Sequence, residues 1–184
     1  MTGRLTMGLY NSLDRTRFAE AHRRAIARAA PVAAAFDCNL AVFGFPFDPD
    51  LRTPVDISKW IVSTTSIGQG GDWIVKLAEE GRFNHFPLPR GGFPPQLGMV
   101  VIATRRPDSR ISASPADVAR ILKKGRSVLL VLGLGPRGLP EEVISMGEHH
   151  MDLTGRGVSL ETCTAIGASV ARIMTHLEVL QHRI

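Results

Sequence analysis

The chain has 184 residues, of which 44% are hydrophobic and 21% are charged, a composition that excludes wholesale disorder and suffices for one domain with its own core. Its longest apolar runs, 97–103 and 128–134, are far shorter than the roughly 20 residues of a membrane helix, and the start resembles no signal peptide. Two cysteines offer neither a disulfide framework nor a metal-ligand pattern, so we expect a cytoplasmic protein without a metal and without membrane contact. The net charge of +5 suits an anionic partner, although a merely solvated surface explains it equally well.

The first half of the chain predicts two strands, at 5–10 and 39–45, on either side of a helix from Asp14 to Phe36. Asp14 is the expected N-cap of that helix, and Pro31 is expected to end or kink it. Two further helices are expected, over 55–68 and 69–81. The proline-rich stretch 83–96 is expected to be irregular or an excursion at the sheet edge.

In the second half, strands are expected at 97–104, 127–132 and 149–153. Helices are expected over 114–125, over 140–146 and from 159 almost to 184. Ser114 and Ser159 are the expected N-caps of two of these helices, and Pro140 is the expected first residue of the third. Helices that alternate with strands predict an α/β fold, a mostly parallel sheet with helices on both faces. Ligands of such sheets bind at the carboxyl ends of the strands.

Three glycines in the loop after strand 127–132 have the spacing G-x-G-x-x-G, namely Gly133, Gly135 and Gly138. This pattern can hold the diphosphate of a dinucleotide, and Asp152 lies where a ribose-binding acid is then expected. However, Pro140 would lie inside the required helix, and Glu141 and Glu142 would repel a diphosphate at its start. Positive φ angles or the close passage of another segment explain the glycines better. A dinucleotide-dependent oxidoreductase is therefore the less favoured alternative.

The segments VLLVL, GLGPRGLP, EEVISMG, HHMDL, TGRGV and SLETCTAIGASV resemble, in order, the last strands, loops and helix of the SPOUT, or α/β-knot, RNA methyltransferases. GMVVIATRRPDSR is similar to the third strand of that family, and TMGLYNSLDRTRF is compatible with its opening unit. An uncharacterised archaeal branch with GLYN, GLGPxGLP and SLETCTAIGA resembles the chain most. The resemblance implies one domain over 1–184 with a C-terminal trefoil knot in roughly 127–184. It also implies an S-adenosylmethionine-dependent methyltransferase that acts on tRNA or rRNA.

Backbone groups of the knot loops surround the cofactor in that family. Carried onto this sequence, the resemblance implies a cofactor pocket formed by Thr104, Leu132, Gly133, Gly135, Gly138, Leu153, Thr154, Val158 and Leu160. The catalytic residues of the family's ribose methylases do not carry over, because Gly135, Glu161 and Pro31 stand where a glutamate, an asparagine and an arginine are expected. A base nitrogen is therefore an open target. A non-catalytic RNA-binding knot protein is the main alternative.

Three residues are candidates for catalysis, namely Asn11, Arg17 and Glu161. Glu161 lies at the start of the last helix, where it accepts a proton or grips the acceptor base, or only complements the helix dipole. Asn11 follows the first strand as a catalytic or a turn residue. Arg17, together with His22, is expected to meet RNA phosphate or solvent.

Arg105, Arg106 and Arg110 cluster in one loop at the ligand edge and are the candidate RNA-binding residues. Other guanidinium and aromatic faces of the kind that hold splayed bases come from Arg90, Phe45, Phe47 and Phe93, although core packing is the stronger expectation for the phenylalanines. The last helix carries an apolar stripe formed by Ile166, Val170, Ile173, Met174, Leu177 and Leu180. Burial on its own sheet explains that stripe, while the family resemblance implies a homodimer through this helix and the knot.

Overall fold

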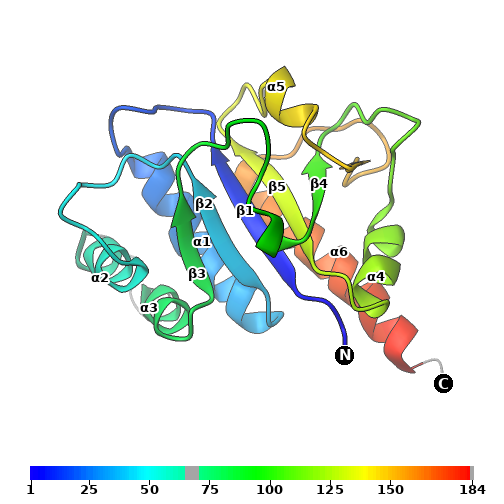
Figure 1. Ribbon diagram of the computed structural model, residues 1–184, viewed down its shortest axis with the longest axis horizontal. Helices are drawn as coiled ribbons and strands as arrows, with labels where there is room; N and C mark the ends of the chain where they lie inside the picture. Colours follow the sequence, from blue (N-terminus) through cyan, green and yellow to red (C-terminus); the bar gives the residue numbers. More distant parts are fainter. Residues whose placement is uncertain (65–70, 183–184) are drawn as a thin grey trace.

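A single six-stranded sheet is the framework of the molecule in a computed structural model that describes residues 1–64 and 71–182. The strands are β1 (Leu5–Asn11), β2 (Asn39–Phe43), β3 (Phe83–Phe86), β4 (Met99–Ala103), β5 (Val128–Leu134) and β6 (His149–Met151). They lie in the order β3-β2-β1-β5-β4-β6, and every neighbouring pair is parallel. All carboxyl ends therefore meet at one edge, the upper edge in Figure 1.

The two central strands, β1 and β5, show the burial that is typical of a parallel sheet. β1 and β5 pair over seven residues, from Leu5 with Val128 to Asn11 with Leu134. Nearly all of their residues are buried, as is usual for strands that are covered on both faces. The expected α/β fold is confirmed, and the sheet is wholly rather than mostly parallel.

The helices are α1 (Glu20–Ala35), α2 (Pro54–Thr64), α3 (Asp72–Glu79), α4 (Pro115–Lys123), α5 (Glu141–Ile144) and α6 (Thr162–His182). All of them except α5 bury apolar residues in the core on one face of the sheet, where α1 and α6 lie side by side (Figure 1). The other face is covered by α5 and by the proline-rich segment 86–97, which includes a short 3-10 turn (Pro95–Leu97). The helices are thus distributed less evenly over the two faces than expected.

Local side-chain contacts decide where the helices begin. Ser114 caps α4 as expected, because its Oγ accepts from the Asp117 amide at 3.2 Å while the Asp117 carboxylate accepts from the Ser114 amide at 2.9 Å. Asp14 does not cap α1; its Oδ1 accepts the amides of Thr16 and Arg17 and closes a turn that delays the helix to Glu20. Pro140 is the N-cap of α5 rather than its first residue.

Two expectations about helix ends need correction. Pro31 does not end α1, which continues to Ala35 because Ala29, Ala30 and Ala33 are fully buried against the core. Ser159 is exposed and does not begin α6, which starts at Thr162. The segment 83–96 contains an edge strand, β3, that the sequence indicated only as an excursion.

The expected helices over 55–68 and 69–81 correspond to α2 and α3, and their residues 65–70 lie outside the described residues, as do residues 183–184 after α6. Within residues 1–64 and 71–182, no helix is both long enough and apolar enough to cross a membrane.

Candidate functional site

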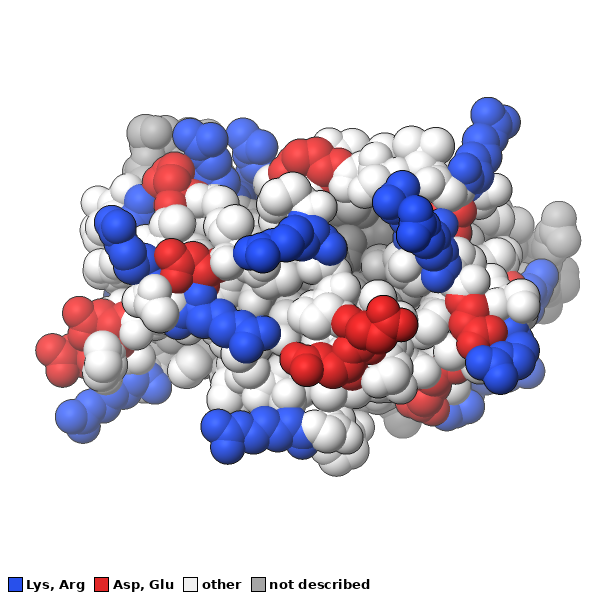
Figure 2. All heavy atoms as spheres, turned by 90° about the horizontal axis from the view of Figure 1, so that it is seen from above, with Lys and Arg blue, Asp and Glu red and all other residues white. Residues whose placement is uncertain are grey.

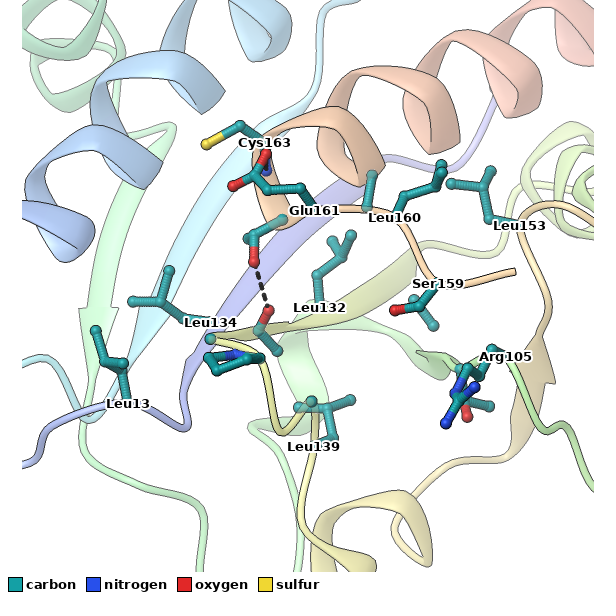
Figure 3. A pocket seen from close by; sticks show the side chains of 18 of the residues that line it. Leu13, Arg105, Leu132, Leu134, Leu139, Leu153, Ser159, Leu160, Glu161 and Cys163 are labelled. Atoms are coloured by element: carbon teal, nitrogen blue, oxygen red, sulfur yellow. Dashed lines mark hydrogen bonds between the residues drawn. The ribbon is translucent and has the colours of Figure 1, made fainter. Parts of the chain in front are cut away.

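A cavity of about 670 Å³ opens at the carboxyl edge of the sheet, a volume that suits a small-molecule ligand. Its walls are formed by the loops that follow β4, β5 and β6, by the first residues of α6 and by one side of α1 (Figure 3). Six leucines supply most of the apolar lining, namely Leu13, Leu132, Leu134, Leu139, Leu153 and Leu160. We call this space the leucine cavity.

The end of β5 forms an open backbone edge in the leucine cavity. β4 pairs with β5 only as far as Ile102 with Val131, whereas β5 continues beside β1 to Leu134. The three residues 132–134 therefore have a strand neighbour on one side only. The backbone groups of this stretch that point away from β1 can serve a flat heterocyclic ligand as donors and acceptors. Thr162 Oγ1 donates to the Gly133 carbonyl at 3.2 Å and ties α6 to this edge (dashed in Figure 3).

The glycines of the loop after β5 are required by backbone geometry. A Cβ on Gly133 would lie 2.9 Å from the Gly138 carbonyl carbon and 3.1 Å from the Leu139 amide nitrogen. Gly135 and Gly138 have φ angles of +114° and +67°. The expected positive φ is therefore confirmed for Gly135 and Gly138, whereas Gly133 is required by the close return of its own loop rather than by the passage of another segment. The helix that follows has only four residues and two glutamates in its first turn, an arrangement unlike that of a dinucleotide site.

Asp152 closes the loop after β6 upon itself. Its carboxylate accepts from the Thr154 amide at 3.0 Å, from Thr154 Oγ1 at 2.9 Å and from the Gly157 amide at 2.7 Å. Burial raises the pKa of Asp152, but the hydrogen bonds from Gly157 and Thr154 outweigh it and hold that pKa below its ordinary value. The Arg172 guanidinium of α6 donates to the Leu153 carbonyl. This loop is thus held in shape from both ends.

Glu161 caps α6. Its Oε2 accepts from the amides of Cys163 at 2.9 Å and Thr164 at 3.3 Å, the place that Ser159 was expected to fill. Glu161 also lines the leucine cavity, beside Cys163. Burial raises the pKa of the Cys163 thiol, so this sulfur is a poor nucleophile at neutral pH.

Most of the residues implied for the cofactor pocket do lie together. Eight of the nine line the leucine cavity, and the ninth, Thr154, is engaged in the Asp152 turn. Among the candidate catalytic and RNA-binding residues, Glu161 and Arg105 line the cavity, whereas Asn11, Arg17, Arg106 and Arg110 do not. Arg110 forms an ion pair with Asp108 at 2.6 Å, and that contact holds the pKa of Asp108 down to about 2.

Asn11 is buried at the end of β1, and its side chain makes four hydrogen bonds. Its Nδ2 donates to the carbonyls of Asp14 at 2.6 Å and Gly44 at 2.8 Å. Its Oδ1 accepts from the Leu13 amide at 3.1 Å and lies 2.9 Å from Nε2 of His22. Asn11 therefore fixes the loop after β1 rather than facing the leucine cavity.

His22 is fully buried, which corrects the expectation that it meets RNA phosphate or solvent. Its Nδ1 accepts from the Ala19 amide at 3.0 Å, so Nε2 carries the proton that is donated to Asn11. Burial lowers the pKa of His22, consistent with a neutral ring. Arg17, by contrast, is exposed to solvent.

Three charged residues of α1 also line the leucine cavity and were not expected there, namely Glu20, Arg24 and Arg28. They are spaced four residues apart on one helix face, a signal that the sequence offered but that acquires meaning only when α1 crosses the end of β5. Figure 2 shows basic and acidic side chains interspersed over this edge of the molecule. In the described part of the chain, no group of three or more histidine, cysteine or acidic side chains is arranged to hold a metal ion.

The fold is similar to that of several solved methyltransferases. A probable methylase family protein from Haemophilus influenzae Rd KW20 aligns with 100% of this chain and 70% of its own, with a TM-score of 0.63 and 14% identity. A probable methyltransferase from Bordetella pertussis Tohama I aligns with 95% of this chain and 96% of its own, with a TM-score of 0.62 and 12% identity. An AdoMet-bound rRNA methyltransferase from Sinorhizobium meliloti covers 96% of this chain, which spans 58% of that protein, with a TM-score of 0.52 and 16% identity.

The chain therefore has the α/β fold of these solved methyltransferases, and the expected resemblance is confirmed at the level of the fold. The chain belongs to the family described as "Protein of unknown function (DUF531)", whose profile matches residues 5–174. An uncharacterized protein of Methanocaldococcus jannaschii is 43% identical over 177 residues, which cover 96% of this chain and 97% of the relative. This relative fits the expected archaeal branch.

Proposed function

We propose that the protein is an S-adenosylmethionine-dependent RNA methyltransferase that binds its cofactor in the leucine cavity. The observation that carries the proposal is the convergence of the β5 loop, the β6 loop and the start of α6 on one cavity at the carboxyl edge of the sheet. Solved proteins with the same fold support it, because they are methyltransferases by name and one is an AdoMet-bound rRNA enzyme. The knot in 127–184 is part of the same proposal.

The lining fits this cofactor chemically. Leucine side chains give apolar walls for an adenine ring, and the open edge at 132–134 supplies backbone donors and acceptors. The charged lining contains Glu20, Asp152 and Glu161 beside Arg24, Arg28 and Arg105. Both signs are thus available for the amino and carboxylate groups of a methionine moiety, and the carboxylates suit a cationic sulfonium better than a diphosphate. When bound, the cofactor supplies an electrophilic methyl group.

The residues around the leucine cavity favour an acceptor that needs no prior loss of a proton. Each lining carboxylate is already engaged: Glu20 with Arg23 and Arg24, Asp152 with its own loop, and Glu161 with the first turn of α6. A ribose hydroxyl needs a general base because its proton must leave as the methyl group arrives, whereas a ring nitrogen with a free lone pair does not. We therefore propose a base nitrogen of tRNA or rRNA as the methyl acceptor.

Calorimetry with S-adenosylmethionine and S-adenosylhomocysteine tests the cofactor step. We expect both to bind and NADH not to bind. Leu132→Glu, which places a carboxylate on the apolar wall, should abolish binding, while Leu97→Glu, on the other face of the sheet and outside the cavity lining, serves as the matched control. Binding of NADH alone, or of none of the three, would refute the proposal.

Incubation of total cellular RNA with the protein and isotopically labelled cofactor, followed by mass spectrometry of nucleosides, tests the transfer step. We expect label on a base. Label on ribose would contradict the assigned acceptor while leaving the methyltransferase intact. Cofactor binding without any transfer would favour the alternative of a non-catalytic RNA-binding protein, which the engaged Glu161 and Asp152 carboxylates and the buried Asn11 also suit.

A further inference from the structure

A second cavity lies at the same edge of the sheet, beyond the loop that follows β1. It measures about 880 Å³ and is lined by the segments that follow β2 and β3, with Arg15 and Arg90 at its wall. Prolines and phenylalanines supply most of the remaining lining. We call this space the proline cavity. Residues 86–97 form its floor, and their conformation is fixed by packing against the face of the sheet that α5 also covers, where Phe93 contacts Phe43 edge to face at 5.0 Å.

The proline cavity is positively charged, in contrast to the leucine cavity. Its lining contains two arginines and no carboxylate. Within residues 1–64 and 71–182, neither Arg15 nor Arg90 takes part in an ion pair. The Arg15 guanidinium is directed by the hydroxyl of Tyr10, to which it donates at 3.2 Å. Two uncompensated guanidinium groups beside flat apolar walls fit a ligand that has both a negative charge and an apolar ring.

One loop separates the two cavities and is fixed on both sides. Leu13 lines the leucine cavity and Arg15 lines the proline cavity. Ser12 Oγ donates to the Leu134 carbonyl at 2.6 Å, and Asn11 Nδ2 donates to the Gly44 carbonyl at 2.8 Å. The wall between the cavities is therefore anchored to a lining residue of each, which holds Arg15 at a fixed place relative to the leucine cavity.

We infer that the proline cavity holds an unpaired RNA nucleotide that neighbours the methyl acceptor, with its base against the apolar floor and its phosphate between Arg15 and Arg90. This inference rests on the proposed function and adds the place where the RNA is gripped. The nucleotide must be unpaired, because a base inside a duplex presents no face to a protein wall. The same chemistry in a free mononucleotide is the other source of such a ligand, and the experiment separates the two.

Fluorescence anisotropy with a labelled single-stranded RNA of mixed sequence tests the assignment, with calorimetry of S-adenosylmethionine as the second readout. We expect the double variant Arg15→Ala/Arg90→Ala to bind the RNA about tenfold more weakly and with a smaller salt dependence. Its affinity for S-adenosylmethionine should stay unchanged. Arg126→Ala is the matched control, because it removes an exposed arginine at the amino end of β5.

The outcomes separate the inference from the proposed function. If the double variant binds RNA as tightly as the wild type, the assignment of the proline cavity is overturned while cofactor binding still stands. If the wild type binds RNA through these arginines but does not bind S-adenosylmethionine, the proposed function fails instead. Tight binding of AMP or UMP to the wild type, lost in the double variant and without competition from RNA, would overturn the RNA assignment in favour of a free nucleotide.

Discussion

Asn11 and His22 show how much of the site depends on buried polar side chains that touch no ligand. Together they connect the end of β1, the first turn of α1 and the Gly44 carbonyl after β2. Every donor and acceptor of the pair that can bond is bonded, so replacing either residue leaves buried partners unsatisfied. Both cavities depend on this pair for the shape of the loop between them.

The neutral state of His22 makes stability depend on pH. Burial lowers its pKa in the folded chain, so the unfolded chain takes up a proton first as the pH falls. We expect the free energy of unfolding, measured by urea titration, to decrease as the pH falls below about 6.5, the ordinary histidine pKa, and to level off below the folded pKa. His22→Gln should make the free energy of unfolding depend less on pH over this range. His176→Gln, at an exposed site on α6, should leave that pH dependence unchanged. Equal slopes in the two variants would contradict the assignment.

Among the glycines that line the leucine cavity, Gly133 is the one at which an added Cβ would lie closest to other atoms. Because a Cβ there would lie 2.9 Å from backbone, we expect Gly133→Ala to lower the free energy of unfolding by about 2 kcal/mol and to weaken cofactor binding. Thermal and urea denaturation with calorimetry measure both effects. Gly92→Ala is the control, since a Cβ at Gly92 meets nothing within 4 Å. Wild-type stability in Gly133→Ala would mean that the β5 loop does not pass so closely.

At the scale of the elements, two variants of Glu161 in the first turn of α6 distinguish a capping role of this residue from a catalytic one. Glu161→Ala should cost about 1 kcal/mol of stability through the lost cap, and Glu161→Gln should restore most of it because an amide oxygen still accepts from Cys163 and Thr164. Since the carboxylate is engaged in this way, we expect Glu161→Gln to keep its methyl-transfer rate. A fall in kcat with unchanged stability and KM would instead show that Glu161 acts on the substrate.

The elements differ in how far the sequence could predict them. Strands β4 and β5 were predictable because each is a continuous apolar run. The start of α4 was predictable from Ser114, because capping is a contact across three residues. The prediction that Asp14 caps α1 was wrong because an aspartate side chain accepts hydrogen bonds from the next amides of the chain both in a turn and at the start of a helix. β3 has four residues beside a proline, and only its pairing with β2 defines it as a strand.

The candidate site divides in the same way. The glycines and leucines of the β5 and β6 loops could be predicted from their pattern and from the family resemblance. The contribution of Arg24 and Arg28 could not, because it depends on where α1 crosses the sheet. The proline cavity could not be predicted either. Its two arginines, Arg15 and Arg90, are far apart in the chain, and only the order of β1, β2 and β3 places both in its lining.

At the scale of the whole molecule, the apolar stripe of α6 packs against the core of its own chain. Ile166, Val170 and Ile173 are fully buried in the core, so the intramolecular explanation of the stripe is confirmed. A homodimer through α6 would have to use its opposite side, where Val179 is 46% exposed. The dimer thus stays a prediction, and it concerns a different surface of the helix from the stripe that suggested it.

Light scattering coupled to size exclusion tests the dimer. We expect a mass of about 40 kDa, twice the 20.0 kDa of one chain. Val179→Glu should shift the mass toward the single chain by placing a charge in the interface, while Trp73→Ser, which removes an exposed aromatic side chain on α3, should not. A mass of 20 kDa for the wild type at all concentrations would exclude the dimer.

The loop from Ser12 to Arg15 has one more consequence. The loop borders both cavities, and it is fixed to the leucine cavity by Ser12 and to the proline cavity by the preceding Asn11. A ligand that displaces the loop on one side therefore alters the fit on the other. Thermodynamic linkage then requires the effect to be mutual, so that whichever of cofactor and RNA arrives first changes the affinity for the second by the same factor. The affinities for the two ligands would thus be coupled through the four residues that follow a single strand.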